Sequence, residues 1–212
     1  MAIKDFDIEI LYGDEEVKKL SKSSLPDIYD LNYYNRLSRR EIFLNNYVDD
    51  ECVDYAYQII QWNREDKDIP IEQRKKIKIF LHTSGGDVTA MNALISAIQL
   101  SKTPCMTIGL GKIFSAGAML LLAAKERLLL SNSRVMIHKG SSGIISDVNK
   151  IIDYSKYLEK DNEACKQYIL ENTKMTNKKY KEVEDKDWYL FPSECVDLGI
   201  ATGIITDIDQ II

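Results

Sequence analysis

The sequence has few of the residues that build metal centres and disulfide frameworks. Its 212 residues include only two histidines and four cysteines, and the cysteines form no Cys-x-x-Cys pair. Zinc sites and disulfide-rich folds need such ligands in clusters, so we expect no metal ion. We interpret Cys52, Cys105, Cys165 and Cys195 as buried free thiols.

Long apolar runs and an excess of positive charge are also lacking. The longest uncharged apolar stretch, Ile113–Ala124, is shorter than the roughly 18 residues that a membrane span needs. The acidic first residues do not fit a secretory signal, so we expect a cytoplasmic protein without a membrane partner. A formal net charge of −5 argues against a dedicated nucleic-acid surface.

Nucleotide-binding motifs are incomplete. The segment GLGKI, residues 109–113, has Ile113 where a P-loop needs Ser or Thr, and it lacks the upstream glycine of that motif. Phe114 occupies the last position of a Gly-x-Gly-x-x-Gly pattern. We therefore expect no bound ATP and no other cofactor.

From Arg40 onward, strand-like and helical segments alternate, which predicts an α/β fold with crossover connections. The expected strands cover residues 40–44, 77–82, 105–110, 134–138 and 203–208, and the expected helices cover residues 49–62, 87–102, 147–173 and 177–186, with another helix after Ser115. Residues 1–38 show no helical periodicity beyond one turn and are interpreted as an N-terminal arm, an axial or docking region. Residues 39–212 are expected to form a single domain.

The expected helix at 147–173 is long for a domain of this size. It carries apolar residues on more than one face, including Ile151, Tyr154, Leu158 and Ile169. One small domain cannot bury all of them. This pattern favours a projecting helix that contacts a partner.

Three short motifs follow three of the expected strands: HTSGGD at 82–87, GKIFSAG at 111–117 and MIHKG at 136–140. Functional groups of open α/β sheets gather beyond the carboxyl ends of the strands. Ser115 therefore has two interpretations, a helix N-cap or a nucleophile on a sharp strand-to-helix turn.

The other motif residues also have two interpretations each. The Ser84–Gly86 turn either supplies the positive φ that a turn needs or brings a backbone amide to an oxyanion. His82 and His138 are the two candidates for a general base, and either could serve structurally. The acid that would orient the base stays open among five downstream aspartates: Asp147, Asp153, Asp185, Asp187 and Asp197.

The segments Ile77–Gln99, Gly109–Gly140 and Glu182–Ile200, in this order, resemble the Clp protease proteolytic subunit family, ClpP, and its phage-borne relatives. The resemblance runs from about Ile28 to the end of the chain. It implies a ClpP/crotonase-like α/β fold of repeated ββα units, with a protruding handle helix over about 147–173.

The resemblance also implies roles for individual residues. Ser115 matches the nucleophile, His138 the base and Asp187, in the motif KDW, the orienting acid. The amides of Gly86 and Ala116 match the oxyanion hole, and Gly85 and Asp87 fall in the substrate-binding turn. Among the departures from the family pattern are Ser84 in place of Pro, Ala116 in place of Met, and Lys139 and Gly140 in place of Gln-Pro.

The implied activity is that of a serine endopeptidase that cleaves unfolded polypeptides inside a homo-oligomer of two stacked rings. An AAA+ unfoldase is the implied partner, and the chain itself needs no ATP. A phage-type head-maturation protease and a catalytically silent scaffold subunit of a mixed ring are the alternatives. A crotonase-like acyl-CoA enzyme shares the fold but does not need this triad.

Overall fold

The computed structural model describes residues 28–140 and 142–212, which fall into two units, Ile28–Arg39 and Arg40–Ile212. Most of the expected N-terminal arm, residues 1–27, lies outside the described residues. Its last part forms helix α2, Ile28–Arg39, which corrects the prediction of no sustained helix before residue 39. The sequence pattern is misleading here because Leu31, Tyr33 and Tyr34 are exposed and mark no buried stripe.

The second unit contains a seven-stranded sheet, counted over the described residues. Its strands are β1 (Glu41–Leu44), β2 (Ile77–Thr83), β3 (Cys105–Phe114), β4 (Glu126–Leu130), β5 (Arg134–Ile137), β6 (Trp188–Leu190) and β7 (Gly203–Ile205). The order β1-β2-β3-β4-β7 is parallel throughout, and β5 pairs in parallel with the end of β3. Only β6 is antiparallel, to β5, so the predicted α/β class is confirmed.

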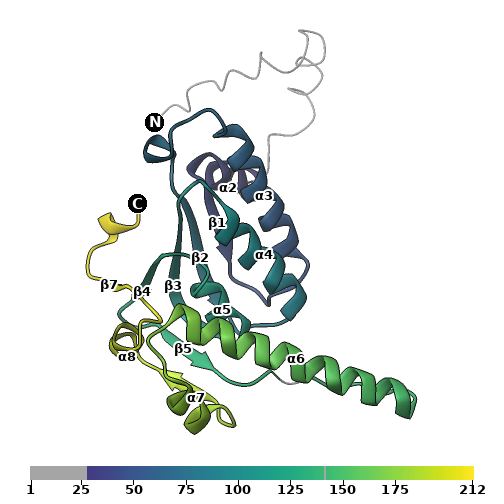
Figure 1. Cartoon of the computed structure of the whole chain (residues 1–212). Coiled ribbons are helices and arrows are strands. Elements are labelled where there is room, and N and C mark those ends of the chain that lie inside the picture. Colours follow the sequence, from purple (N-terminus) through teal and green to yellow (C-terminus); the bar gives the residue numbers. More distant parts are fainter. Residues whose placement is uncertain (1–27, 141) are drawn as a thin grey trace. The chain divides into compact units, whose positions relative to one another are not determined.

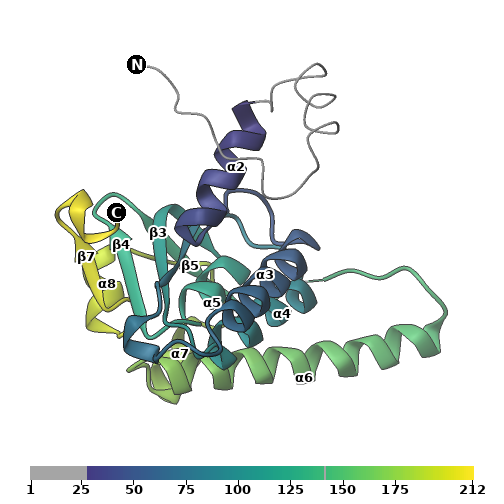
Figure 2. The same cartoon turned by 90° about the horizontal axis from the view of Figure 1, so that it is seen from above.

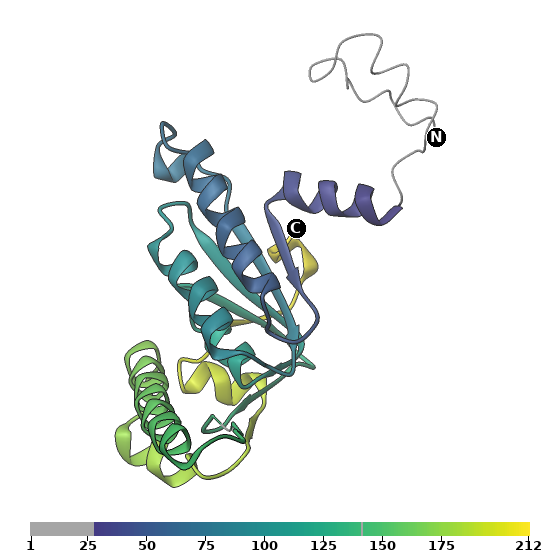
Figure 3. The same cartoon turned by 90° about the vertical axis from the view of Figure 1, so that its right-hand side faces the viewer.

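Helices α3 (Glu51–Glu65) and α4 (Val88–Leu100) cover one face of this sheet, and short α5 (Ala116–Leu121) lies beside them (Figures 1 and 3). Side chains of β2 alternate between the two faces, and Ile77, Ile79 and Leu81 are fully buried on the helix side. The C-terminal segment lies on the other face (Figure 3), where Ile211 packs against Met106. The core is therefore concentrated between β2, β3 and the three helices.

The remaining elements are α6 (Val148–Asn172), α7 (Asn177–Val183), α8 (Pro192–Asp197) and two 3₁₀ turns, Ile71–Gln73 and Ile208–Gln210. The helix predicted over 147–173 is α6, and it projects beyond the sheet (Figures 1 and 2). Of its residues only Ile169, near the C-terminal end, is buried. Arg127 anchors this end because its guanidinium donates to the carbonyls of Asn172 and Gly199, at 3.0 and 2.8 Å.

Within residues 28–140 and 142–212, no helix combines the length and the apolar character that crossing a membrane requires.

Candidate active site

Ser115 occupies a strained turn between β3 and α5. Its backbone has φ of 55° and ψ of −119°, a left-handed conformation that is rare for residues other than glycine. The turn is held because the amide of Ser115 donates to the carbonyl of Met136 on β5, at 2.8 Å. Although Ser115 stands at the N-cap position, its hydroxyl lies 2.8 Å from His138 Nε2 instead of on an amide of α5.

The glycine turn after β2 packs directly against this serine. A Cβ atom on Gly85, whose φ is 95°, would come within 2.7 Å of the Cβ of Ser115. A Cβ on Gly86, whose φ is 154°, would come within 2.2 Å of the carbonyl oxygen of Val48. Both positions therefore require glycine, for the backbone angle and for the close approach.

Val48 fixes the orientation of the same turn. It forms an isolated parallel bridge with Gly86, in which the Val48 amide donates to the Gly85 carbonyl and the Asp87 amide donates to the Val48 carbonyl. In a parallel bridge, the residue that lies between the two bonded ones, here Gly86, directs its own amide away from the opposite segment. The Gly86 amide is thus directed away from Val48, and the Ala116 amide belongs to the first turn of α5, where amides have no intrahelical acceptor.

His138 and Asp187 are brought together by the register of the antiparallel pair β5 and β6. Ile137, the last residue of β5, is paired with Trp188, the first residue of β6. The residues just beyond this pair, His138 and Asp187, therefore face each other, and His138 Nδ1 is 3.1 Å from Asp187 Oδ1. The two distances fit an imidazole that donates from Nδ1 to the carboxylate and accepts at Nε2 from the serine.

The structure separates the other candidates from this group. His82 lies against Gly111 in the sheet, and its Nδ1 accepts from the amide of Lys112 at 3.4 Å. Asp147 and Asp153 form ion pairs with lysines of α6. Of the five aspartates left open by the sequence, Asp187 is the one that contacts His138.

Two residues expected to bind substrate have other contacts in the structure. The carboxylate of Asp87 caps α4 by accepting from the Ala90 amide at 2.8 Å. Hydrogen bonds from the Thr89 hydroxyl and from that amide lower the pKa of Asp87 below its usual range. The amide of Gly85 donates to Thr83 Oγ1 at 3.0 Å, and its carbonyl accepts from Val48. Their roles toward substrate stay predictions.

A small cavity of about 40 Å³ opens beside Ser115 and His138. Its apolar lining comes from α4, α5, β5, α6 and α7, and consists of Val88, Met91, Ala116, Met119, Ile137, Cys165, Ile169 and Tyr180. Lys139 and Asn162 also line the cavity. Burial raises the pKa of Tyr180 to about 12 and also raises the pKa of the Cys165 thiol, so both groups are neutral at pH 7. Most of the cavity wall is therefore uncharged.

Sequence reasoning missed the residues of α6 that face this cavity. Asn162, Cys165 and Ile169 all line it, and their spacing of three and four residues places them on one face of the helix. That spacing predicts that the three side chains share one face of α6, but it does not show which other element this face contacts. Val48 was also missed, because a single residue outside any strand carries no periodicity.

Among the described residues, no three side chains of His, Cys, Asp or Glu lie close enough together to hold a metal ion.

Comparison with known proteins decides the family. The family model described as Clp protease matches residues 27–208 of the 212-residue chain. The chain belongs to the Clp protease family. This confirms the resemblance to ClpP, and it places the chain in a family of proteases.

Two relatives give the extent of the similarity. A 133-residue region is 34% identical to ATP-dependent Clp protease proteolytic subunit 2 of Treponema pallidum (strain Nichols), covering 62% of this chain and 67% of that protein. A 132-residue region is 36% identical to the protein of the same name from Treponema denticola, covering 61% of this chain and 66% of the relative. The chain thus spans about two thirds of the length of the relatives it matches.

Proposed function

We propose that the chain is a serine endopeptidase in which Ser115 is the nucleophile, His138 the general base and Asp187 the orienting acid. The observation that carries this proposal is the unbroken series of contacts from Ser115 Oγ to His138 Nε2 and from His138 Nδ1 to Asp187 Oδ1, 2.8 and 3.1 Å long. Nucleophile, base and orienting group within hydrogen-bond reach are the signature of covalent catalysis.

The reaction proceeds through an acyl-enzyme. Ser115 Oγ attacks the scissile carbonyl while its proton passes to His138 Nε2, and His138 then delivers the proton to the leaving amine. The Gly86 and Ala116 amides stabilise the oxyanion, because both belong to turns that pack against Ser115. Water, deprotonated by His138, attacks the ester and releases the second product.

We infer a preference for a short apolar side chain on the acyl side of the cleaved bond. The cavity beside Ser115 holds little more than one water's share of liquid volume, about 30 Å³, and most of the side chains that line it are apolar. Met91 and Met119 are flexible, so the cavity can adapt to somewhat larger groups.

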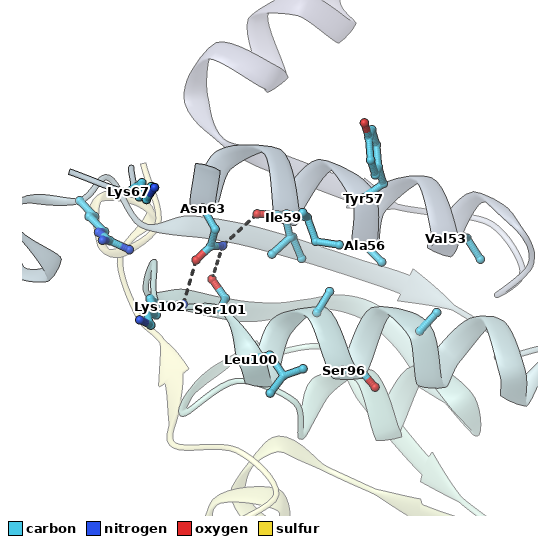
Figure 4. A pocket seen from close by; sticks show the side chains of 14 residues that line it. Val53, Ala56, Tyr57, Ile59, Asn63, Lys67, Ser96, Leu100, Ser101 and Lys102 are labelled. Atoms are coloured by element: carbon cyan, nitrogen blue, oxygen red, sulfur yellow. Dashed lines mark hydrogen bonds between the residues drawn. The ribbon is translucent and has the colours of Figure 1, made fainter. Parts of the chain in front are cut away.

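The proposed working form is a homo-oligomer of two stacked rings, with unfolded polypeptides as substrates. Two apolar surfaces of the single chain support it. On α6, Val148, Ile151 and Ile152 are exposed. Between α3 and α4, a groove of about 650 Å³ is lined by Val53, Tyr57 and Leu100, the last of which is 82% exposed (Figure 4). Exposed patches of this kind mark contact sites in soluble proteins.

The groove shares no lining residue with the cavity at Ser115. Asn63 closes one end of it by bonding to Ser101 Oγ and accepting from the Lys102 amide, at 2.7 and 2.9 Å (Figure 4). We propose that a neighbouring copy or an AAA+ unfoldase covers this groove, in the cytoplasm. The relatives' names, which describe subunits of an ATP-dependent protease, support the unfoldase.

The experiment that tests the activity is hydrolysis of a short fluorogenic peptide with an apolar residue before the reporter. We expect turnover by the wild type and none by Ser115→Ala, whereas Ser131→Ala, at an exposed serine just after β4, should act as the wild type does. Native mass spectrometry on the same samples should show equal assembly. No turnover by the wild type would instead favour the silent scaffold subunit.

A further inference from the structure

The segment that follows His138 is held against α6 by two side chains. The Gly140 amide donates to Asn162 Oδ1 at 3.0 Å, and the hydroxyls of Ser142 and Tyr154 lie 2.6 Å apart. Figure 2 shows the chain leaving β5 and extending outward before it returns as α6. Because a backbone N–H can only donate, the oxygen of the Asn162 amide is the atom that faces Gly140.

His138 lies between two backbone anchors. On its N-terminal side, Ile137 is fixed by pairing with Trp188 in the sheet. Sheet pairing ends there, and the next bond from the backbone to another element is that of Gly140 to Asn162. The contact of the imidazole with Asp187, whose side chain is 56% exposed, constrains the His138 side chain, whereas the Gly140 bond constrains the backbone that carries it.

Asn162 is also in the right place to transmit a change in α6 to the site. It is half-buried, and it lines the same cavity as Ser115, His138 and Cys165. A shift or rotation of α6 moves its acceptor, and with it the peptide two residues beyond the imidazole.

We propose that Asn162 is a positioning residue, which holds His138 within reach of Ser115 by accepting the Gly140 N–H. This proposal rests on the proposed function, since it assigns to His138 the role of base. It predicts that the bond affects the rate of the chemical step more than substrate affinity. Asn162 itself touches no reacting atom.

The test compares Asn162→Leu, which removes the acceptor at similar volume, with Asn162→Asp, which keeps an oxygen in its place. We expect Asn162→Leu to lower kcat about tenfold with KM changed less than about twofold, as for a lost group that acts in the transition state. Asn162→Asp should restore kcat to within about threefold of the wild type. Asn149→Leu, the same change at an exposed position of α6, is the control and should have no effect.

A second variant removes the donor instead of the acceptor. Gly140→Pro lacks the N–H, and Gly140 is not among the glycines with positive φ, which proline could not adopt. We expect a similar loss of kcat, and the double variant Asn162→Leu, Gly140→Pro should be no slower than the slower single variant. Two losses that add would show that the two residues act separately and would overturn the proposal.

Hydrogen exchange of the peptides covering residues 138–146 gives a readout independent of activity. Exchange should be faster in Asn162→Leu than in the wild type and Asn162→Asp. Faster exchange with an unchanged kcat would overturn the positioning role while leaving the triad intact. Equal turnover by the wild type and Ser115→Ala would refute the proposed function, and the exchange data would still decide whether the tether exists.

Discussion

The two halves of the candidate active site are held in different ways. The Ser115 half belongs to the core: its turn is bonded to β5, and the glycine turn packs on it with no room for a Cβ. The His138 half depends on one strand pair, a half-exposed Asp187 and the projecting helix α6. The single chain therefore holds Ser115 and the proposed oxyanion amides rigidly, whereas the alignment of His138, the proposed base, depends on what α6 contacts.

The largest effect should come from the acid of the exposed half. Asp187→Asn should lower kcat by about 10³- to 10⁴-fold, because the imidazole loses the partner that selects its tautomer. Peptide hydrolysis checks this, with Asp185→Asn as the neighbouring control. If Asp185→Asn were the inactive variant instead, the register argument from β5 and β6 would be wrong.

Core residues away from Ser115 should affect stability and not chemistry. Asp66, 1% exposed, accepts two bonds from the Arg40 guanidinium and one from Thr103 just before β3. Asp66→Asn removes the buried charge that pairs with Arg40, which keeps only the exposed Glu65 at 3.7 Å, and should lower the free energy of unfolding by about 3–5 kcal/mol. The control, exposed Asp68→Asn, should change it by less than about 0.5 kcal/mol.

The same carboxylate gives a pH dependence of stability. The hydrogen bond from Arg40 lowers the pKa of Asp66 below its unfolded value of about 3.9. Its stabilisation is complete above that value and is lost as pH falls through the folded pKa. Denaturation midpoints of the wild type should therefore drop below about pH 4 more steeply than those of Asp66→Asn. Parallel curves would exclude Asp66 as a source of acid stability.

Assembly should affect the alignment of His138, because the exposed half of the site depends on α6. Replacing Ile151 and Ile152, which are 40% and 47% exposed, with Glu should prevent α6 from packing against another copy. We expect smaller particles in native mass spectrometry and a loss of activity of about 10²-fold, as for a misaligned catalytic group. Asn149→Glu adds charge to the same helix at a polar position and should leave the particle intact. A fully active monomer of the double variant would show that activity does not depend on assembly.

The smallest effect concerns specificity. Cys165→Leu narrows the cavity beside Ser115, and it should shift the ratio of kcat/KM for alanine over leucine substrates by about tenfold. Ala164→Leu, which adds the same group one residue away on the exposed face, should not. An unchanged ratio in Cys165→Leu would place the substrate side chain elsewhere.

The rigid half is also the half that could be predicted from local sequence. Alternating patterns predicted strands β1, β2, β3 and β5 and helices α3, α4 and α6, and the resulting α/β class is confirmed. The place of Ser115 after a strand and before small residues predicted the strand-to-helix turn but left its role open between an N-cap and a nucleophile, and the family resemblance favoured the nucleophile. The turn at Gly85 and Gly86 was also predictable, because paired glycines after a strand are typical of a turn.

The exposed half could not be read from the residues alone. Five aspartates were equivalent until the pairing of Ile137 with Trp188 selected Asp187, and register between short strands has no local signal. Only the family resemblance pointed to Asp187 from the sequence. Asn162 lies 22 residues from Gly140, and neither segment has a sequence pattern that predicts a contact between them. Helix α2 was missed because its apolar residues are exposed and form no buried stripe.

The most direct measurement of the central claim is covalent labelling with a fluorophosphonate, followed by mass spectrometry of the intact protein and its peptides. The account predicts one adduct per chain, on Ser115, formed by the wild type and by Asn149→Leu, formed much more slowly by Asp187→Asn, and absent from Ser115→Ala. An adduct on another residue, or no adduct from a wild-type protein that hydrolyses peptides, would contradict the serine mechanism proposed for this chain.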